Sequence, residues 1–178
     1  MTGDRILLTL GTFTFAAIVV AMMWWGWSNR ARRQVALPAP PPPPVPRGDV
    51  LVGATPGLFV GTVIAGQWLD RVVVHNLADR SAGWISVSTD GVHIEREGLA
   101  ELFLPFALLV EAHTGDALAG KVVGRDGLLV LTWRLGDPAA GGRVVQSAFR
   151  AEDHGVHARL AGIIAERSTA TTTAGEST

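Results

Sequence analysis

The sequence contains no cysteine and no tyrosine among its 178 residues. Without cysteine, the chain cannot form a disulfide, a thiolate metal site or a cysteine nucleophile. Charged residues are also scarce, at 17%, against about 25% in an ordinary soluble domain. The common nucleotide-binding, zinc-protease and serine-hydrolase motifs are absent as well. We therefore expect a non-enzymatic protein that needs no cofactor and no metal.

The few charges that remain are unevenly distributed along the chain. Residues 1–48 hold five arginines and one aspartate, a formal charge of +4. Residues 49–178 hold ten basic and fifteen acidic residues, a formal charge of −5. An acidic domain is repelled by nucleic-acid phosphates and by anionic lipid headgroups. The sequence therefore argues against nucleic acid and against phosphoinositides as ligands.

Residues 6–27 form a run of 22 residues without a charge. As a helix this run would be about 33 Å long, which is enough to cross a hydrocarbon core of ~30 Å. Trp24, Trp25 and Trp27 lie at its end, where an interfacial aromatic belt is expected. The alternative, a cleaved signal peptide, would have an apolar run of only ~7–15 residues and a small-residue cleavage site. We therefore predict a transmembrane anchor, preceded by a short tail of residues 1–5.

Arginines on the two sides of this anchor predict its orientation. Three of them, Arg30, Arg32 and Arg33, follow the apolar run, whereas Arg5 alone precedes it. Positively charged flanks stay in the cytoplasm. We therefore expect a single-pass protein of the cell membrane with its N-terminus outside and the rest of the chain cytoplasmic.

Two segments are predicted to lack a packed structure. Residues 28–48 are first basic and then proline-rich, with seven of the ten prolines in residues 38–46. Such a segment favours a polyproline II rod of about 28 Å. It could be a docking motif for an aromatic groove, but its position directly after the anchor favours a spacer. Residues 168–178 contain no large apolar residue and are predicted to be disordered.

The remaining residues, 49–167, have mostly β-type patterns. Residues 84–88 and 92–96 alternate in polarity on either side of Asp90-Gly91, which predicts a hairpin. In its second strand, the aliphatic side chains should face the core, and His93 and Glu95 should face solvent.

A second hairpin is predicted from residues 121–125 and 128–133, joined by Asp126-Gly127. The second of these segments has few polar residues and should be buried on both faces. Residues 68–77 fit a helix or a strand, and residues 152–166 fit an amphipathic helix. Further strands are expected at residues 58–65, 101–104, 108–112 and 143–149. About seven strands and one C-terminal helix indicate a small antiparallel barrel or sandwich.

Several short motifs follow one another in a fixed order between residues 55 and 167. They are Gly61-Thr62-Val63, residues 66–72 (GQWLDRV), Asp90-Gly91-Val92 with Ile94-Glu95-Arg96, residues 102–105 (LFLP), residues 119–123 (AGKVV), residues 126–128 with 131–133, and Phe149-Arg150. This order resembles an actinobacterial family of membrane-anchored PH-like proteins, some of which carry a transporter label. The sequence departs from the family at residues 146–148, where an Asp-Thr-Gly is expected.

The resemblance implies a mainly β fold: a PH-like seven-stranded antiparallel barrel capped by a C-terminal α-helix and preceded by one transmembrane helix. Candidate binding residues are Trp68 and Arg71, as an exposed patch, and Lys121 and Arg125, as a weakly basic loop. The alternative for the first pair is that Trp68 packs in the core, while Asp70 and Arg71 form local ion pairs.

His154 and His157 are spaced for one helix face, but we expect exposed polar positions there and not metal ligands. The function that fits best is a membrane-tethered binding or scaffold module whose ligand is a protein or a peptide. The alternative is a component of a transport complex that binds a small molecule or a lipid, which requires an enclosed pocket.

Overall fold

The computed structural model describes residues 2–34, 37–118, 121–122, 127–137 and 142–175. It divides into two compact units, Met1–Ala36 and Leu37–Thr178. The first unit is one helix, α1 (Thr2–Gln34). Its segment Thr9–Gly26 is long and apolar enough to span a membrane, which agrees with the predicted N-terminal apolar helix.

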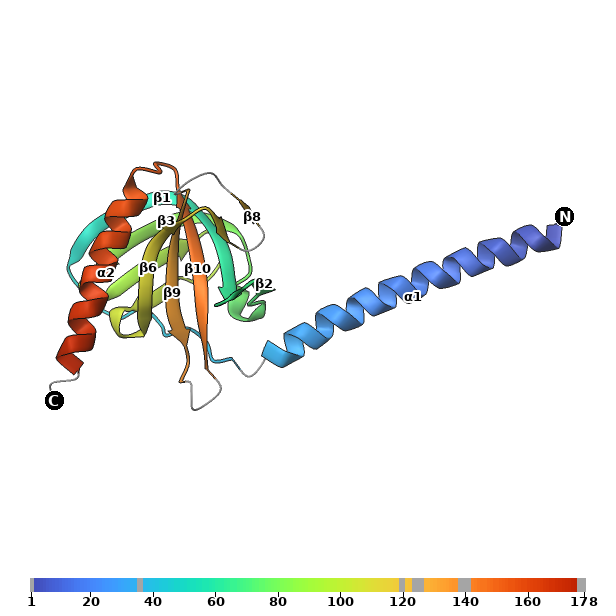
Figure 1. The fold of residues 1–178 in the computed structure, drawn as a ribbon, viewed down its shortest axis with the longest axis horizontal. Helices are drawn as coiled ribbons and strands as arrows, with labels where there is room; N and C mark the ends of the chain where they lie inside the picture. The colour runs from blue at the N-terminus through green and yellow to red at the C-terminus, as the bar shows by residue number, and fades with distance from the viewer. Residues whose placement is uncertain (1, 35–36, 119–120, 123–126, 138–141, 176–178) are drawn as a thin grey trace. The chain divides into compact units, whose positions relative to one another are not determined.

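The second unit is a curved antiparallel sheet with one long helix against it (Figure 1). The sheet strands are β1 (Val50–Ile64), β2 (Gln67–Arg71), β3 (Ser81–Ser88), β4 (Gly91–Arg96), β5 (Leu102–Pro105), β6 (Leu109–Gly115), β9 (Leu128–Leu135) and β10 (Arg143–Ala151). Two short strands, β7 (Ala117–Leu118) and β8 (Lys121–Val122), pair with each other, and 3-10 turns η1 (Val74–Asn76) and η2 (Phe106–Leu108) and the helix α2 (Val156–Gly175) complete the unit.

The strand order is β5-β4-β3-β1-β10-β9-β6, with β2 paired to β1. The sheet is therefore open, with β5 and β6 at its two ends, and the closed form of the predicted barrel is not found. Helix α2 packs against β6, β9 and η2. Its Leu160 and Ile164 enter the core beside Trp133 and Phe149. The core thus lies between the concave face of the sheet and this helix.

The hairpin predicted around Asp90-Gly91 is confirmed as β3 and β4. Glu95 is exposed as expected, but His93 is buried, and its predicted exposure is wrong. The aliphatic neighbours of His93 point into the core, so His93 lies on the opposite face of the sheet. That face is covered as well, by a segment described below.

The second predicted hairpin is wrong. Strand β9 pairs with β6 and β10, and β8 pairs with β7. Asp126 lies outside the described residues. Burial on both faces is confirmed, since every residue from Leu128 to Trp133 is buried. Of the two alternatives for residues 68–77, the strand is found at Gln67–Arg71, and a 3-10 turn follows at Val74–Asn76.

The C-terminal helix begins later and ends later than predicted. It continues through Gly175, so residues 168–175 are helical where we predicted disorder. The hydroxyl groups of Thr169 and Thr171 bond to the carbonyl oxygens four residues earlier, at 2.9 and 3.0 Å. These bonds give the two hydroxyl groups partners within the helix. Residues 176–178 lie outside the description.

The proline-rich segment belongs to the folded unit, which starts at Leu37 and not at the predicted residue 49. We call residues 37–48 the strap. Leu37 is part of the main core cluster, and Arg47 and Gly48 bond to the sheet. The interpretation of these prolines as a free spacer is therefore wrong, because both ends of the segment are attached to the domain.

Candidate functional site

The first end of the strap is held mainly by burial. Leu37 is 5% exposed within the core cluster. Its carbonyl oxygen accepts a hydrogen bond of 2.9 Å from Nε2 of His75. His75 and the following Asn76 both have a φ of 56°, a left-handed conformation that non-glycine residues rarely adopt. Strain of this kind persists where surrounding contacts enforce it, and the bond to Leu37 is one such contact.

The first proline of the strap packs against a glycine from another part of the chain. Gly136 follows β9 with a φ of 80°. A Cβ atom at this position would collide with the ring of Pro38. Because Gly136 has no side chain, the ring of Pro38 can occupy the space beside the backbone after β9.

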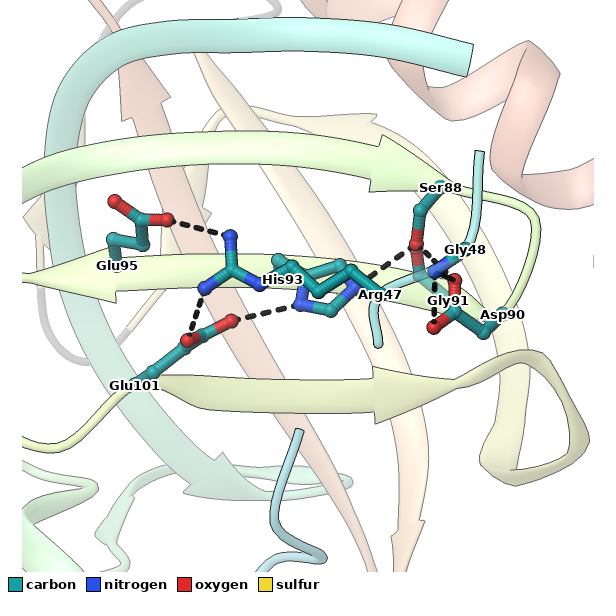
Figure 2. Close-up of polar contacts among 8 residues, drawn as sticks. All are labelled: Arg47, Gly48, Ser88, Asp90, Gly91, His93, Glu95 and Glu101. Atoms are coloured by element: carbon teal, nitrogen blue, oxygen red, sulfur yellow. Dashed lines mark hydrogen bonds and ion pairs between the residues drawn. The ribbon is translucent and has the colours of Figure 1, made fainter. Parts of the chain in front are cut away.

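The second end of the strap is held by polar groups. Two guanidinium nitrogens of Arg47 bond to Oε1 of Glu95 at 2.8 Å and to Oε2 of Glu101 at 2.5 Å (Figure 2). The N–H of Gly48 points to both carboxylate oxygens of Asp90, at 3.1 and 3.0 Å. Adjacent strap residues are thus bound to three acidic side chains from β4, the turn before it and the segment that precedes β5.

Beneath Arg47, a buried histidine connects these carboxylates. His93 is 1% exposed. Its Nδ1 lies 2.7 Å from Oε1 of Glu101, and its Nε2 lies 2.9 Å from the hydroxyl of Ser88. That hydroxyl donates to Oδ1 of Asp90 at 2.5 Å (Figure 2). On the next strand, the ring of Phe103 lies 4.7 Å from the imidazole.

These groups form one connected set that begins and ends on the strap. We call Arg47, Gly48, Ser88, Asp90, His93, Glu95 and Glu101 the His93 network. On the strap, Arg47 binds both Glu95 and Glu101, and Glu101 in turn binds His93. The set then continues through Ser88 and Asp90 to Gly48. A change at His93 can therefore reach the strap from both sides.

The network shifts the ionisation of two of its members. Burial alone would raise the pKa of Asp90, but hydrogen bonds from Ser88 and from the Gly48 N–H outweigh this effect and lower it. The pKa of Arg47 is raised, mainly by its hydrogen bond to Glu95, although partial burial opposes the shift. Since these side chains of Arg47 and Glu95 are 46% and 47% exposed, solvent screens their pair, which is worth about 0.2–1 kcal/mol.

Ser88, His93 and Glu101 follow the order of a hydrolytic nucleophile, base and acid. However, the Ser88 side chain is buried, and its hydroxyl is placed to donate to Asp90 and to the carbonyl oxygen of Gly91. A nucleophile must instead give its proton to the histidine and lie open to substrate. The arrangement therefore favours a structural network over a catalytic one.

The four binding residues expected from the sequence do not form a described patch. The side chains of Trp68 on β2 and Lys121 on β8 lie outside the described residues, as does Arg125 altogether. Arg71 donates from its NH1 to the carbonyl oxygen of Ala78 at 3.1 Å. Arg71 thus binds the backbone of the chain segment before β3.

Among the residues expected at the membrane interface, Trp24 and Trp25 lie on α1, and each is 72% exposed. The side chains of Trp27, Arg30, Arg32 and Arg33 lie outside the described set.

His157 is buried, and its predicted exposure is wrong. Its Nε2 accepts the N–H of Ala151 at 2.9 Å, which joins the start of α2 to the end of β10. His154 is exposed as predicted and stacks on His157 with the ring centroids 5.6 Å apart. In the part of the chain that the structure describes, no group of three or more His, Cys, Asp or Glu residues could hold a metal ion.

Sequence reasoning missed the His93 network because its members come from distant segments. The available signal was an Arg-Gly pair directly after the prolines and three acidic residues around His93, at positions 90, 95 and 101. Their proximity depends on the strap folding back, which no local pattern indicates.

An open antiparallel sheet with a C-terminal helix against it is the arrangement expected of a PH-like domain. The chain belongs to the bacterial PH domain-like family, whose model matches residues 37–165. The match begins at Leu37, where the folded unit and the strap also begin. Comparison with curated proteins gave no match. Membership of this family suggests a binding or scaffold module.

Proposed function

We propose that the protein is a non-enzymatic, membrane-anchored scaffold whose PH-like domain binds a protein or a peptide on the cytoplasmic face. The observation that carries this proposal is the combination in one chain of a PH-like domain, residues 37–165, with an apolar helical segment, Thr9–Gly26.

Three features of α1 support membrane anchoring. No part of the segment Thr9–Gly26 is buried by protein. Trp24 and Trp25 lie at its end, as interfacial residues do. The three arginines that follow favour a cytoplasmic domain by the positive-inside rule.

The open sheet supports a peptide or protein as the ligand. Edge strands have unpaired backbone groups that can bind an extended peptide as an added strand. Strand β6 is one such edge, and its Val110 is exposed. The net charge of −5 over residues 49–178 favours a neutral or basic partner.

The alternative, a small-molecule or lipid site in a transport complex, has weaker support. One depression among the described residues is open and is lined by Ala165, Glu166, Thr169 and Ala170 of α2 alone. A small-molecule site normally encloses its ligand with polar groups from several elements.

Site-specific photo-crosslinking in cells tests the proposal. A photoreactive residue at Val110 should crosslink to a defined protein that also copurifies with the full chain. A peptide taken from the sequence of that partner should compete for the site and reduce the crosslink. The matched control is the same residue at Glu97, an exposed position after β4. Equal products from both positions, or none from Val110, would argue against a protein ligand at this edge. Selective thermal stabilisation by a lipid or metabolite would favour the alternative.

A further inference from the structure

The convex face of the sheet, opposite to the main core, has two covers among the described residues. The strap lies over the part formed by β4 and β5, where His93 is buried. Leu118 of β7 covers a part formed by β1, β9 and β10, in a small apolar cluster that includes Val60 and Val130. On β3, between these two parts, Trp84 is 40% exposed. Tryptophan is enriched among the residues that carry the binding energy of protein interfaces.

The direction of Trp84 follows from its neighbour on β3. Ile85 is fully buried in the main core cluster, and side chains alternate along a strand, so Trp84 points to the convex face. The register places Pro56 of β1 and Glu95 of β4 directly beside it. Glu152 extends this row across the sheet, because its N–H donates to the carbonyl oxygen of Pro56 at 3.1 Å. The exposed indole therefore lies in a row that has a glutamate at each end.

A second row lies beside the first. Ala82 of β3 pairs with Leu58 of β1, which in turn pairs with Arg150 of β10. At the other end of this row, the N–H of Glu97 donates to the carbonyl oxygen of Ala82 at 2.9 Å. Leu58 is half-buried, and Ala82 is exposed. Together the two rows form an apolar surface, the Trp84 patch, which consists of Trp84, Pro56, Ala82 and Leu58.

The residues at the four corners of the Trp84 patch are mostly acidic. Glu95, Glu97 and Glu152 occupy three corners, and Arg150 occupies the fourth. Three carboxylates and one guanidinium give a formal charge of −2. Among the described residues, neither Glu97 nor Glu152 has an ion-pair partner. Glu95 binds Arg47 through Oε1 alone, and its side chain is 47% exposed. The border can therefore accept a cation from outside the chain.

We propose that the Trp84 patch binds an arginine-containing segment of a partner protein. A guanidinium group is planar, so it can stack on an indole ring while its N–H groups bond to a carboxylate beside that ring. Trp84 and Glu95 offer these two partners on adjacent strands. The carboxylates of Glu97 and Glu152 add attraction at two further corners. The methylene groups of the arginine cover the apolar surface next to the indole.

This inference rests on the proposed binding function, but it uses a different surface. Strands β1, β10 and β9 separate β3 from β6, the edge strand that contains Val110. The formal charge of −5 over residues 49–178 favours a basic partner here as well. The same acidic border disfavours a lipid surface, because anionic headgroups are repelled by carboxylates.

Photo-crosslinking from the Trp84 patch identifies the segment that binds there. In cells, the full chain with a small diazirine amino acid at Ala82 should crosslink to a protein segment that contains arginine. Because Glu97 lies at a corner of the patch, a photoreactive residue there should give the same product, which should differ from the product at Val110. The crosslinked segment, made as a synthetic peptide, should bind the full chain in detergent. The same peptide with citrulline, a neutral isostere, in place of arginine should bind about tenfold more weakly.

Substitutions in the chain separate the patch from its overall charge. Trp84→Leu keeps an apolar side chain but removes the indole, and it should weaken the arginine peptide about tenfold. Trp84→Phe keeps an aromatic ring and should retain most of the affinity, and Glu152→Gln should weaken binding by about two- to threefold. Val144→Ala, at another exposed apolar position on β10, is the matched control and should leave the affinity unchanged. Denaturant unfolding shows that each variant is folded.

The proposal is overturned if Ala82 gives no protein product, or if its product is a lipid or a second copy of the chain. It is also overturned if the citrulline peptide, or the Trp84→Leu variant, binds as tightly as the original pair. A specific product at Val110 together with any of these results would leave the proposed function in place and remove only the Trp84 patch. No specific product at either position would remove both.

Discussion

Arg47, the first residue after the proline run, forms an ion pair with Glu101, which lies 54 positions later in the chain. This pair joins the strap to the start of β5, the strand at one end of the open sheet. The proline-rich segment is thereby a folded part of the PH-like domain. Its charged end, and not its prolines, provides the specific contacts that we can test.

Replacing Arg47 by alanine should lower the free energy of unfolding by about 0.5–1.5 kcal/mol, since the half-exposed guanidinium bridges two carboxylates. Arg47→Glu should cost more, because it adds a fourth acid beside three others. Denaturant unfolding of the full chain in detergent measures both effects. Arg143→Ala, at an exposed position on β10, is the control and should change stability by less than about 0.5 kcal/mol. Equal effects at the two arginines would show that the bridge contributes nothing.

Leu37→Ala should destabilise the domain by about 2–5 kcal/mol, the usual cost of truncating a buried leucine. The same measurement on Val45→Ala should give a change close to zero, because that side chain is in solvent. If both substitutions are silent, the strap is not part of the folded unit in solution.

Asp90→Asn should destabilise the domain at pH 7 by about 1 kcal/mol, because the charged acceptor of Ser88 and Gly48 is replaced by a neutral amide. The folded-state pKa of Asp90 is lowered, so its contribution is present above the ordinary value of 3.8. It is lost as the pH falls through the lower, folded-state value. The stability difference between the two proteins should therefore shrink only in strong acid. A difference that already vanishes at pH 5 would contradict the lowered pKa.

Gly136→Ala should cost about 1–3 kcal/mol, since alanine at a positive φ is strained and its Cβ would meet Pro38. Gly53→Ala provides a matched control on β1, where a Cβ meets no atom within 4 Å. Thermal unfolding of the pair should separate them clearly. Identical melting temperatures would mean that Pro38 does not occupy this space.

The parts of the fold that depend on local signals could be predicted from the sequence. Asp90-Gly91 encodes its turn in two residues, so the β3–β4 hairpin follows from adjacent alternation. The apolar run near the N-terminus likewise needs only its own length and composition. Non-local pairing was less accessible, and β9 was assigned to a hairpin although it pairs with β6 and β10.

The candidate site was the least predictable part, for a related reason. His93 alternates with core residues and therefore reads as a solvent-facing position. It is buried because the strap folds over that face. Arg47 of the strap lies 46 positions before His93 in the sequence. By contrast, Arg71 was chosen for its place in a motif, but its side chain bonds to a nearby carbonyl.

Cysteine labelling in intact cells is the most direct test of the proposed anchoring of a cytoplasmic PH-like domain by α1. A single Glu97→Cys substitution introduces the only thiol of the chain. The protein should stay in the membrane fraction after an alkaline wash, and a membrane-impermeant maleimide should label it only after the cells are permeabilised. Labelling of intact cells would contradict the cytoplasmic placement, and release by the wash would contradict the anchor.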